Sequence, residues 1–270
     1  MQTERIATAV AALVAARRSG QPWTPPTAWA DLSTDEAYAI QADVAQAMGW
    51  FADAPTAWKA GGAPNVSGAP LPQVLPTPAT WSPPSWGVPE EAPGDLPTLA
   101  TSIATSTWII EAEVAFRLGR APDSTHPEAD ILQCLDTVAV AIEAIDTRLH
   151  HGLQQPSAWK LADQGVHGTL VLGPEQAARP VLAWDEATWR QLAWAFTRNG
   201  QPESAGHGGL PAITPHSALR WLASHAARHT GGLRAGDVVT TGAWAVVRAE
   251  RGDTIQASFT GLGDAKLTLA

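Results

Sequence analysis

The chain has 270 residues, of which 45% are hydrophobic and 16% charged, and its formal net charge is −9. This composition supplies a sizeable hydrophobic core and excludes a chain that is disordered throughout. The acidic balance argues against binding to nucleic acid or to an anionic membrane surface. The single cysteine, Cys134, excludes an intrachain disulfide and a cysteine-rich zinc site, which is typical of a reducing cytosol.

The first twenty residues have the hydrophobic spacing of a helix. Ile6, Val10 and Leu13 fall on one helical face, and Gly20 is placed to end the helix. Arginines occupy positions 17–18, where a signal peptide would have small residues at its cleavage site. We therefore expect no secretion signal, and no apolar run reaches the roughly 20 residues needed to cross a bilayer.

A second helix is predicted to begin after Ser33. Ser33 and Glu36 have capping-box spacing, and an apolar stripe continues from there to Met48. The segment 61–97 is rich in proline and glycine, and it keeps neither helical nor strand periodicity. We expect it to be irregular, either as a linker or as a loop over a site.

Two later segments alternate in the manner of half-buried strands. In residues 108–117 the apolar side chains point one way, whereas Glu111 and Glu113 point the other. Residues 138–142 alternate similarly and predict a strand whose opposite face carries Glu143. Two strands are therefore predicted to present three glutamates on their polar faces.

The rest of the chain mixes short helices with strands. The patterns predict a short helix near residues 131–135, a strand at 168–173, a helix from Trp189 through Phe196 closed by Asn199-Gly200, a helix between 214 and 232, and antiparallel strands over about the last 35 residues. Regular alternation of strands with helices is missing from the sequence. The patterns therefore predict an α+β fold or a mixed β-roll, with an N-terminal part that is helical.

Motifs for several common activities are absent from the sequence. It contains no GxGxxG, no Walker A motif, no HExxH and no GxSxG. Dinucleotide binding, phosphate cradling, zincin chemistry and the serine-hydrolase nucleophile therefore lose their usual support.

The strongest positive signal is the pair Glu111 and Glu113. Two carboxylates at this spacing on one strand face repel each other unless a positive charge lies between them. A divalent cation such as Mg²⁺ or Mn²⁺ suits such hard oxygen ligands. The alternative is an ordinary solvated strand face. Glu143 favours the metal site, because a third carboxylate from a neighbouring strand leaves coordination positions open for substrate and water.

Other charged residues allow two interpretations each. Lys59, beside Trp58 and two glycines, is either partly desolvated and aimed at an anionic ligand or an ordinary surface lysine. The same alternatives hold for Lys160, which precedes Asp163 by three residues. His225 and His229 have the spacing of a shared metal site, although the end of a helix also favours histidine.

Several stretches together resemble the 2-keto-4-pentenoate hydratase family of the fumarylacetoacetate hydrolase-like superfamily. The resemblance covers roughly residues 35 to 265, and its motifs fall in the same order as in the family. The matching stretches are Ala37 to Gln41, Trp58 to Gly61, Ile110 to Gly119, Ile142 to Arg148, Ala162 to Gly173, Ala218 to Ala223, and Leu233 to Ala243.

This resemblance implies an enzyme that adds water to a 2-hydroxy-2,4-dienoate, the enol of a 2-keto-4-enoate from aromatic catabolism. It implies Mg²⁺ or Mn²⁺ held by Glu111, Glu113 and Glu143. It assigns catalysis to Lys59, Asp163 and Lys160. It assigns substrate binding to Trp58, Gly61, Gln164 and Gly242.

Departures from the family pattern keep other activities open. Gln164 stands where the hydratases carry asparagine, and Lys160 has a spacing from Asp163 that resembles the C–C hydrolase branch. Glutamate at position 143 is the residue that the hydratases carry at the corresponding position. The alternatives are a metal-dependent C–C hydrolase of acylpyruvates, a 2-keto acid decarboxylase, and a non-catalytic partner subunit.

The expected organisation has three parts. Residues 1–60 form an N-terminal helical region, residues 61–100 a proline-rich irregular segment, and residues 101–270 the metal-binding β-roll. The family resemblance further implies a homo-oligomer whose partner is a small 2-keto or enol carboxylic acid. The single cysteine and the acidic composition favour a cytoplasmic protein with no nucleic acid and no membrane involved.

Overall fold

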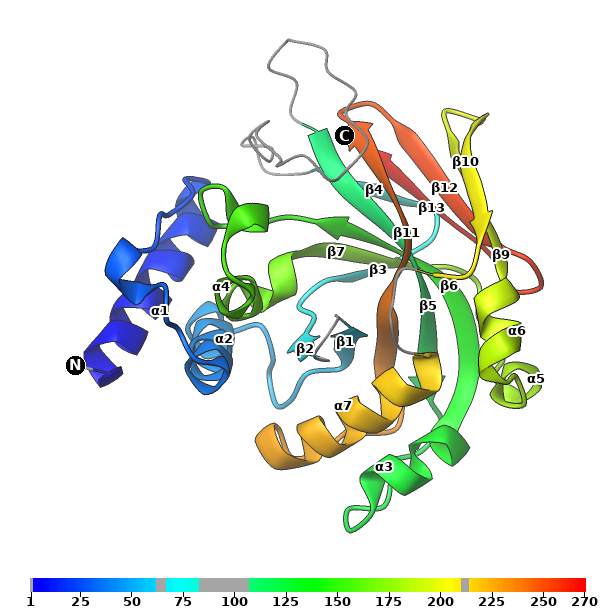
Figure 1. Ribbon diagram of the computed structural model, residues 1–270, viewed down its shortest axis with the longest axis horizontal. Helices are drawn as coiled ribbons and strands as arrows, with labels where there is room; N and C mark the ends of the chain where they lie inside the picture. The colour runs from blue at the N-terminus through cyan, green and yellow to red at the C-terminus, as the bar shows by residue number, and fades with distance from the viewer. Residues whose placement is uncertain (1, 62–66, 83–106, 210–213) are drawn as a thin grey trace.

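The computed structural model describes residues 2–61, 67–82, 107–209 and 214–270, and its core consists of two β-sheets (Figure 1). The first sheet has the order β2-β1-β11-β5-β6-β7-β3, with β8 paired to β6. Its strands are β1 (Ala57–Gly61), β2 (Ser67–Pro70), β3 (Val74–Pro76), β5 (Thr107–Leu118), β6 (Leu135–Ile145), β7 (His167–Leu172), β8 (Gln176–Ala177) and β11 (Val238–Glu250). It is a mixed sheet, because β1 pairs in parallel with β11 and β3 with β7.

The second sheet has the order β10-β9-β12-β13-β4. Its strands are β4 (Ala79–Trp81), β9 (Ala193–Arg198), β10 (Gln201–His207), β12 (Thr254–Phe259) and β13 (Gly263–Leu269). Only β4 and β13 pair in parallel among these strands of the described chain. Strand β13 contacts β6, so the two sheets pack against each other.

The helices lie around these sheets. They are α1 (Gln2–Ser19), η1 (Thr27–Trp29), α2 (Thr34–Met48), α3 (Pro127–Asp130), η2 (Ile131–Cys134), η3 (Gly152–Gln154), α4 (Ser157–Ala162), η4 (Gln164–Val166), α5 (Arg179–Leu182), α6 (Glu186–Gln191) and α7 (Pro215–His229). Figure 1 shows α1, α2 and α4 grouped on one side of the molecule and α5 and α6 on the other. The predicted α+β class with an N-terminal helical part is confirmed.

The two faces of β5 and β6 differ in what they contact. The apolar face, with Val114, Val140 and Ile142, belongs to the main core between the sheets, which also includes residues of α7, β12 and β13. The opposite face contacts a smaller cluster that includes Ala141 and Leu170. Burial of the apolar face fixes the strand register, and it therefore sets which side chains point to the other face.

Several local predictions are confirmed. Helix α1 ends at Gly20, whose φ is +72° and whose N–H donates to the carbonyl of Ala16 at 2.9 Å. The capping box of α2 is formed by Ser33 and Glu36. Strands β5 and β6 carry the glutamates on the predicted face, and the helix ended by glycines corresponds to α7.

Two predictions are wrong. The helix expected from Trp189 through Phe196 ends with α6, and β9 follows it. Asn199 and Gly200 form the hairpin turn between β9 and β10, with φ of +51° and +78°, as a two-residue turn of type I′ requires. The segment 61–97 is also not irregular over 67–81, where β2, β3 and β4 form; residues 83–97 lie outside the described chain.

Candidate metal and substrate site

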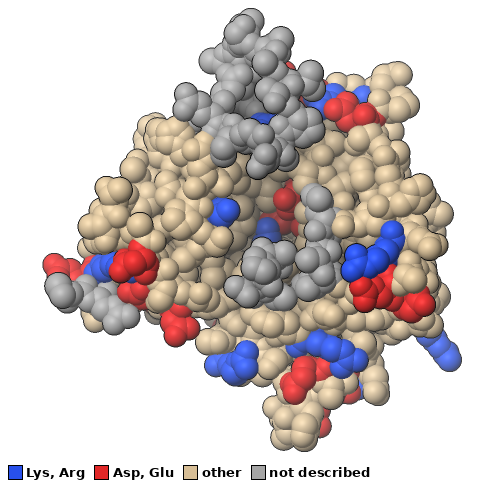
Figure 2. Space-filling view, in the orientation of Figure 1, with Lys and Arg blue, Asp and Glu red and all other residues tan. Residues whose placement is uncertain are grey.

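Three glutamates converge on the face of the first sheet that points away from the main core. Glu111 of β5 and Glu143 of β6 are direct partners in the antiparallel register, and Glu113 lies two residues farther along β5. One carboxylate oxygen from each lies within 4.8 Å of the others. Glu113 and Glu143 are fully buried, whereas Glu111 is half-buried. Figure 2 shows a hollow in the middle of one face, with acidic and basic side chains at its bottom.

The electrostatics of this cluster are unfavourable without a further positive charge. Burial, followed by the charge of Glu143, raises the pKa of Glu113 well above its usual range. Burial also raises the pKa of Glu111 to about 7, with Lys59 acting against the shift. Thr240 of β11 donates to Oε2 of Glu113, but Oε1 is buried with no partner in the described chain. An orphaned carboxylate oxygen in a set of hard oxygen donors fits a divalent cation.

Lys59 belongs to the same cluster. Its Nζ donates to Oε2 of Glu143 at 2.7 Å and to the carbonyl of Gly165 at 3.2 Å. Burial acts to lower the pKa of Lys59, but the attraction of the three glutamates outweighs it and raises the pKa above its usual value. Gly165 has a φ of +62°, and a Cβ there would lie 3.2 Å from Cδ of Lys59. The turn therefore fits closely around the lysine.

Two polar neighbours of the glutamates are absent from the site predicted from the sequence. Nδ1 of His167, at the start of β7, lies 2.8 Å from Oε1 of Glu143, and both side chains are fully buried. Thr240 is the second, through its bond to Glu113. A threonine in a β-strand carries no signal of its own, and His167 directly precedes the segment that was predicted as a strand. Both residues lie within stretches that carry the family resemblance, Ala162 to Gly173 and Leu233 to Ala243, but the resemblance assigned no role to either.

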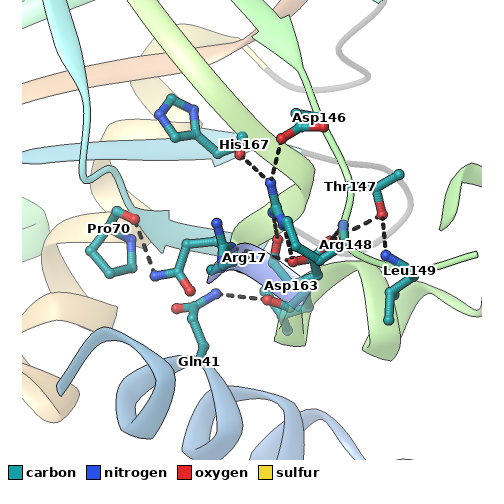
Figure 3. Close-up of polar contacts among 11 residues, drawn as sticks. Arg17, Gln41, Pro70, Asp146, Thr147, Arg148, Leu149, Asp163 and His167 are labelled. Carbon is teal, nitrogen blue, oxygen red and sulfur yellow. Dashed lines mark hydrogen bonds and ion pairs between the residues drawn. The ribbon is translucent and has the colours of Figure 1, made fainter. Parts of the chain in front are cut away.

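Asp163 lies in a buried arginine network next to this cluster (Figure 3). Its carboxylate accepts from the backbone N–H of Arg148 at 2.8 Å, from Nε of Arg148 at 2.6 Å and from Thr147 at 3.0 Å. Nη2 of Arg17, from α1, adds a longer contact of 3.2 Å. Nη1 of Arg148 also donates to the carbonyl of His167 at 2.8 Å. The structure therefore places Asp163 among arginines rather than among the three glutamates.

The other predicted site residues are distributed more widely. Trp58 is buried in the main core, on the opposite face of β1 from Lys59. The side chain of Lys160 has no hydrogen-bond or ion-pair partner within the described ranges, although its backbone N–H donates to the carbonyl of Pro156 at 3.2 Å. Gly61 lies against Gly242, because a Cβ at Gly61 would come within 3.1 Å of Cα of Gly242. The buried amide of Gln164 donates to the carbonyl of Pro70 at 3.3 Å, and its Oε1 has no partner in the described chain.

His225 and His229 do not form part of a three-residue metal cluster. Their rings are 4.5 Å apart, and the ring of Tyr38 lies 4.5 Å from that of His225. In the described parts of the chain, the glutamates are the only group that brings three potential metal ligands together. The two histidines instead line a separate cavity of about 590 Å³ between α2 and α7.

Comparisons with known proteins agree with this architecture. Residues 69–270 match the family model described as fumarylacetoacetate (FAA) hydrolase C-terminal. The chain is 29% identical to the 2-keto-4-pentenoate hydratase of Paraburkholderia xenovorans (strain LB400) over 181 residues, which are 64% of this chain and 62% of that protein. It is 31% identical to the TodF product hydratase of Pseudomonas putida over 169 residues, 60% of this chain and 59% of that protein. The chain thus spans less than two thirds of these relatives.

One similar solved structure is 4-oxalocrotonate decarboxylase from Pseudomonas putida G7, complexed with magnesium and adipate. It has a TM-score of 0.75 and 17% sequence identity, and the match covers 100% of this chain and 98% of that chain. At this identity the likeness establishes the fold alone. Among the described residues, no helix has the length and apolar character required to cross a membrane.

Proposed function

Because the chain belongs to the fumarylacetoacetate hydrolase C-terminal family, we propose that it is a divalent-metal-dependent hydratase that adds water to a 2-hydroxy-2,4-dienoate. The observation that carries this proposal is the convergence of Glu111, Glu113 and Glu143 beside the buried amine of Lys59. The hydratase names of relatives at 29–31% identity support the choice of reaction.

Glu111, Glu113 and Glu143 would hold the cation, which we propose to be Mg²⁺ or Mn²⁺. Their buried carboxylates repel one another, and the free Oε1 of Glu113 offers a further ligand atom. A cation bound there supplies stabilisation of the negative charge that develops on the 2-oxygen of a keto acid. The carboxylates therefore have a chemical reason to be buried together.

Lys59 is proposed to hold and deliver the proton of the reaction. Its Nζ is protonated in this arrangement, because the surrounding carboxylates raise its pKa. The hydrogen bonds to Glu143 and Gly165 fix the position of the ammonium group next to the carboxylates. A dienol that lay over these groups would receive a proton on carbon from Nζ and return its 2-hydroxyl proton to the amine, which gives the 2-keto acid; water would then add across the distal double bond, with its OH going to one carbon and its proton to the other.

Gly61, Gly242 and Gln164 are proposed to contact the substrate. Gly61 ends β1, two residues beyond Lys59, and its backbone packs closely against Gly242 of β11, since a Cβ at Gly61 would come within 3.1 Å of Cα of Gly242. Gln164 directly precedes the Gly165 carbonyl that binds Lys59. The positions of Asp163 and Trp58 instead favour supporting functions, in the arginine network and in the core respectively.

Decarboxylation and C–C hydrolysis remain second candidates for a specific reason. The glutamates and Lys59 recognise the acidic head group that all these substrates share, whereas the distal end of the substrate decides the reaction. Product analysis separates them, because hydrolysis yields two acids, decarboxylation yields CO₂ and hydration only adds water.

We also propose a cytoplasmic homo-oligomer, whose size light scattering would measure.

The test is a spectroscopic assay on a panel of 2-hydroxy-2,4-dienoates. The protein is freed of metal with EDTA, and the loss of dienol absorbance is followed with and without Mg²⁺ or Mn²⁺. We expect loss only with metal, and we expect Glu111→Gln to abolish it. Glu186→Gln, a change at an exposed carboxylate of α6, is the matched control. Absence of any reaction across the panel would refute the enzymatic proposal and favour a non-catalytic partner subunit.

A further inference from the structure

We infer that His167 is a positioning residue, and that it holds Glu143 in the orientation needed to bind the cation. This inference rests on the proposed metal site. It assigns to His167 a function that the neighbouring sequence motif does not indicate.

A β-bulge turns His167 toward the glutamates. In the pairing of β6 with β7, Ala144 faces Thr169 but Ile145 faces His167, so Gly168 is the extra residue. Side chains alternate along a regular strand, and without the bulge His167 would lie on the same face as Thr169. The inserted residue reverses this alternation and brings His167 to the face that carries Glu143.

Only glycine fits at the bulge. A Cβ at Gly168 would lie 2.7 Å from the carbonyl oxygen of Ala144, 2.9 Å from Cβ of Asp146 and 3.0 Å from the ring of Trp81. Two of these three atoms belong to backbone or to a short side chain, which cannot move away cheaply. The pair His167-Gly168 therefore acts as a unit, because the glycine permits the bulge and the bulge directs the histidine.

His167 and Lys59 each hold one oxygen of Glu143. Nδ1 of His167 lies 2.8 Å from Oε1, and Nζ of Lys59 lies 2.7 Å from Oε2. Because a carboxylate oxygen accepts, Nδ1 carries the proton in this contact. Each oxygen keeps a second lone pair, which is free to bind a cation. The carboxylate is thus prevented from rotating without being blocked as a ligand.

The histidine is itself held in place. Arg148 donates to its backbone carbonyl at 2.8 Å. Arg148 is in turn bound by Asp163. The buried arginine network next to the site therefore acts on Glu143 through His167. Partners that orient a metal ligand in this way typically change metal affinity about 10–100-fold when they are removed.

The experiment is a Mn²⁺ titration of metal-free protein by calorimetry, with thermal unfolding of each variant measured in parallel. We expect His167→Ala to bind Mn²⁺ about 10–100-fold more weakly than the natural protein. His167→Asn should bind within about threefold, because its amide nitrogen takes the place of Nδ1. His207→Ala, at an exposed position of β10, is the control and should leave binding unchanged.

His167→Gln distinguishes positioning from packing if His167→Ala does not fold. Its amide nitrogen reaches the place of Nε2 rather than Nδ1, so we expect weaker Mn²⁺ binding than in His167→Asn at equal stability. Equal affinities of the folded His167 variants and the natural protein would overturn the inference and leave the proposed function standing. A natural protein that binds no Mn²⁺ would overturn both.

Discussion

Glu111 lowers the free energy of unfolding of the metal-free protein as the pH rises. The magnitude of this loss follows from the raised pKa of its carboxyl group. Its pKa is raised from 4.5 to about 7, first by burial and then by Glu143. The folded state therefore keeps a proton that the unfolded state loses. Stability is complete below pH 4.5 and falls as the pH rises through 7. At 1.36 kcal/mol per pH unit, the loss between pH 5 and pH 8 is about 2.5 kcal/mol.

Glu111→Gln isolates this contribution. Urea unfolding in EDTA, at pH values from 5 to 8, gives the free energy of unfolding of both proteins. Glutamine does not titrate. The free energy of unfolding of the variant minus that of the natural protein should therefore be about 2.5 kcal/mol larger at pH 8 than at pH 5. Titrating groups that Glu111 does not influence, including His167, contribute to both proteins and cancel in the difference. The charge of Glu111 also raises the pKa of Glu113, so the loss of that effect in the variant adds to the difference in the same direction.

Metal should remove the same pH dependence. A cation that binds the folded state at a hundred times its Kd adds about 2.7 kcal/mol of stability, and it requires the carboxylates to be ionised. Saturating Mn²⁺ should therefore stabilise the natural protein more at pH 8 than at pH 5 and have little effect on Glu111→Gln. Parallel stability profiles of the two proteins in EDTA would refute the electrostatic reasoning. Glu186→Gln should follow the natural protein throughout.

Three further substitutions test other parts of the site. Lys59→Met should lower kcat for the dienoate about 10²–10⁴-fold while Mn²⁺ still binds. Lys59→Arg should not restore kcat, because the planar guanidinium does not fit the position of Nζ between Glu143 and the carbonyl of Gly165. A kcat equal to that of the natural protein in either variant would contradict this in steady-state kinetics. Arg148→Met should cost about 3–5 kcal/mol in urea unfolding, because it leaves Asp163 buried without its main partner; a loss below about 1 kcal/mol would contradict the network. Gly165→Ala should cost about 1–2 kcal/mol for its positive φ and lower kcat by displacing Lys59; unchanged stability and activity would argue against a close fit there.

The parts of the fold that could be predicted from the sequence are those with local causes. The alternation in β5 and β6 placed Glu111, Glu113 and Glu143 on one face, and the register confirms the placement. The capping box of α2 and the glycines that end α7 are similarly local signals. In each case neighbouring residues contain the physical reason for the structure, namely a strand period or the unpaired groups at a helix end.

The parts that failed depend on partners far along the chain. Residues 193–198 have a spacing that suits a helix, but they pair with β12 and with β10, and this pairing overrides the periodicity. Strands β3 and β4 contain or adjoin prolines, which made the segment look irregular. Both are edge strands in their sheets, where a missing N–H does not interrupt a ladder.

The residues around the glutamates show a more general limit. Alternation identifies metal ligands, because they occupy regular positions in a strand. The partners of those ligands lie where alternation is interrupted: His167 adjoins the bulge at Gly168, and regular pairing of β11 stops at Thr240, two residues before Gly242. A bulge is set by how two strands meet, not by either strand alone. A glycine beside a polar residue within an otherwise regular strand is therefore the sequence feature most worth examining for such partners.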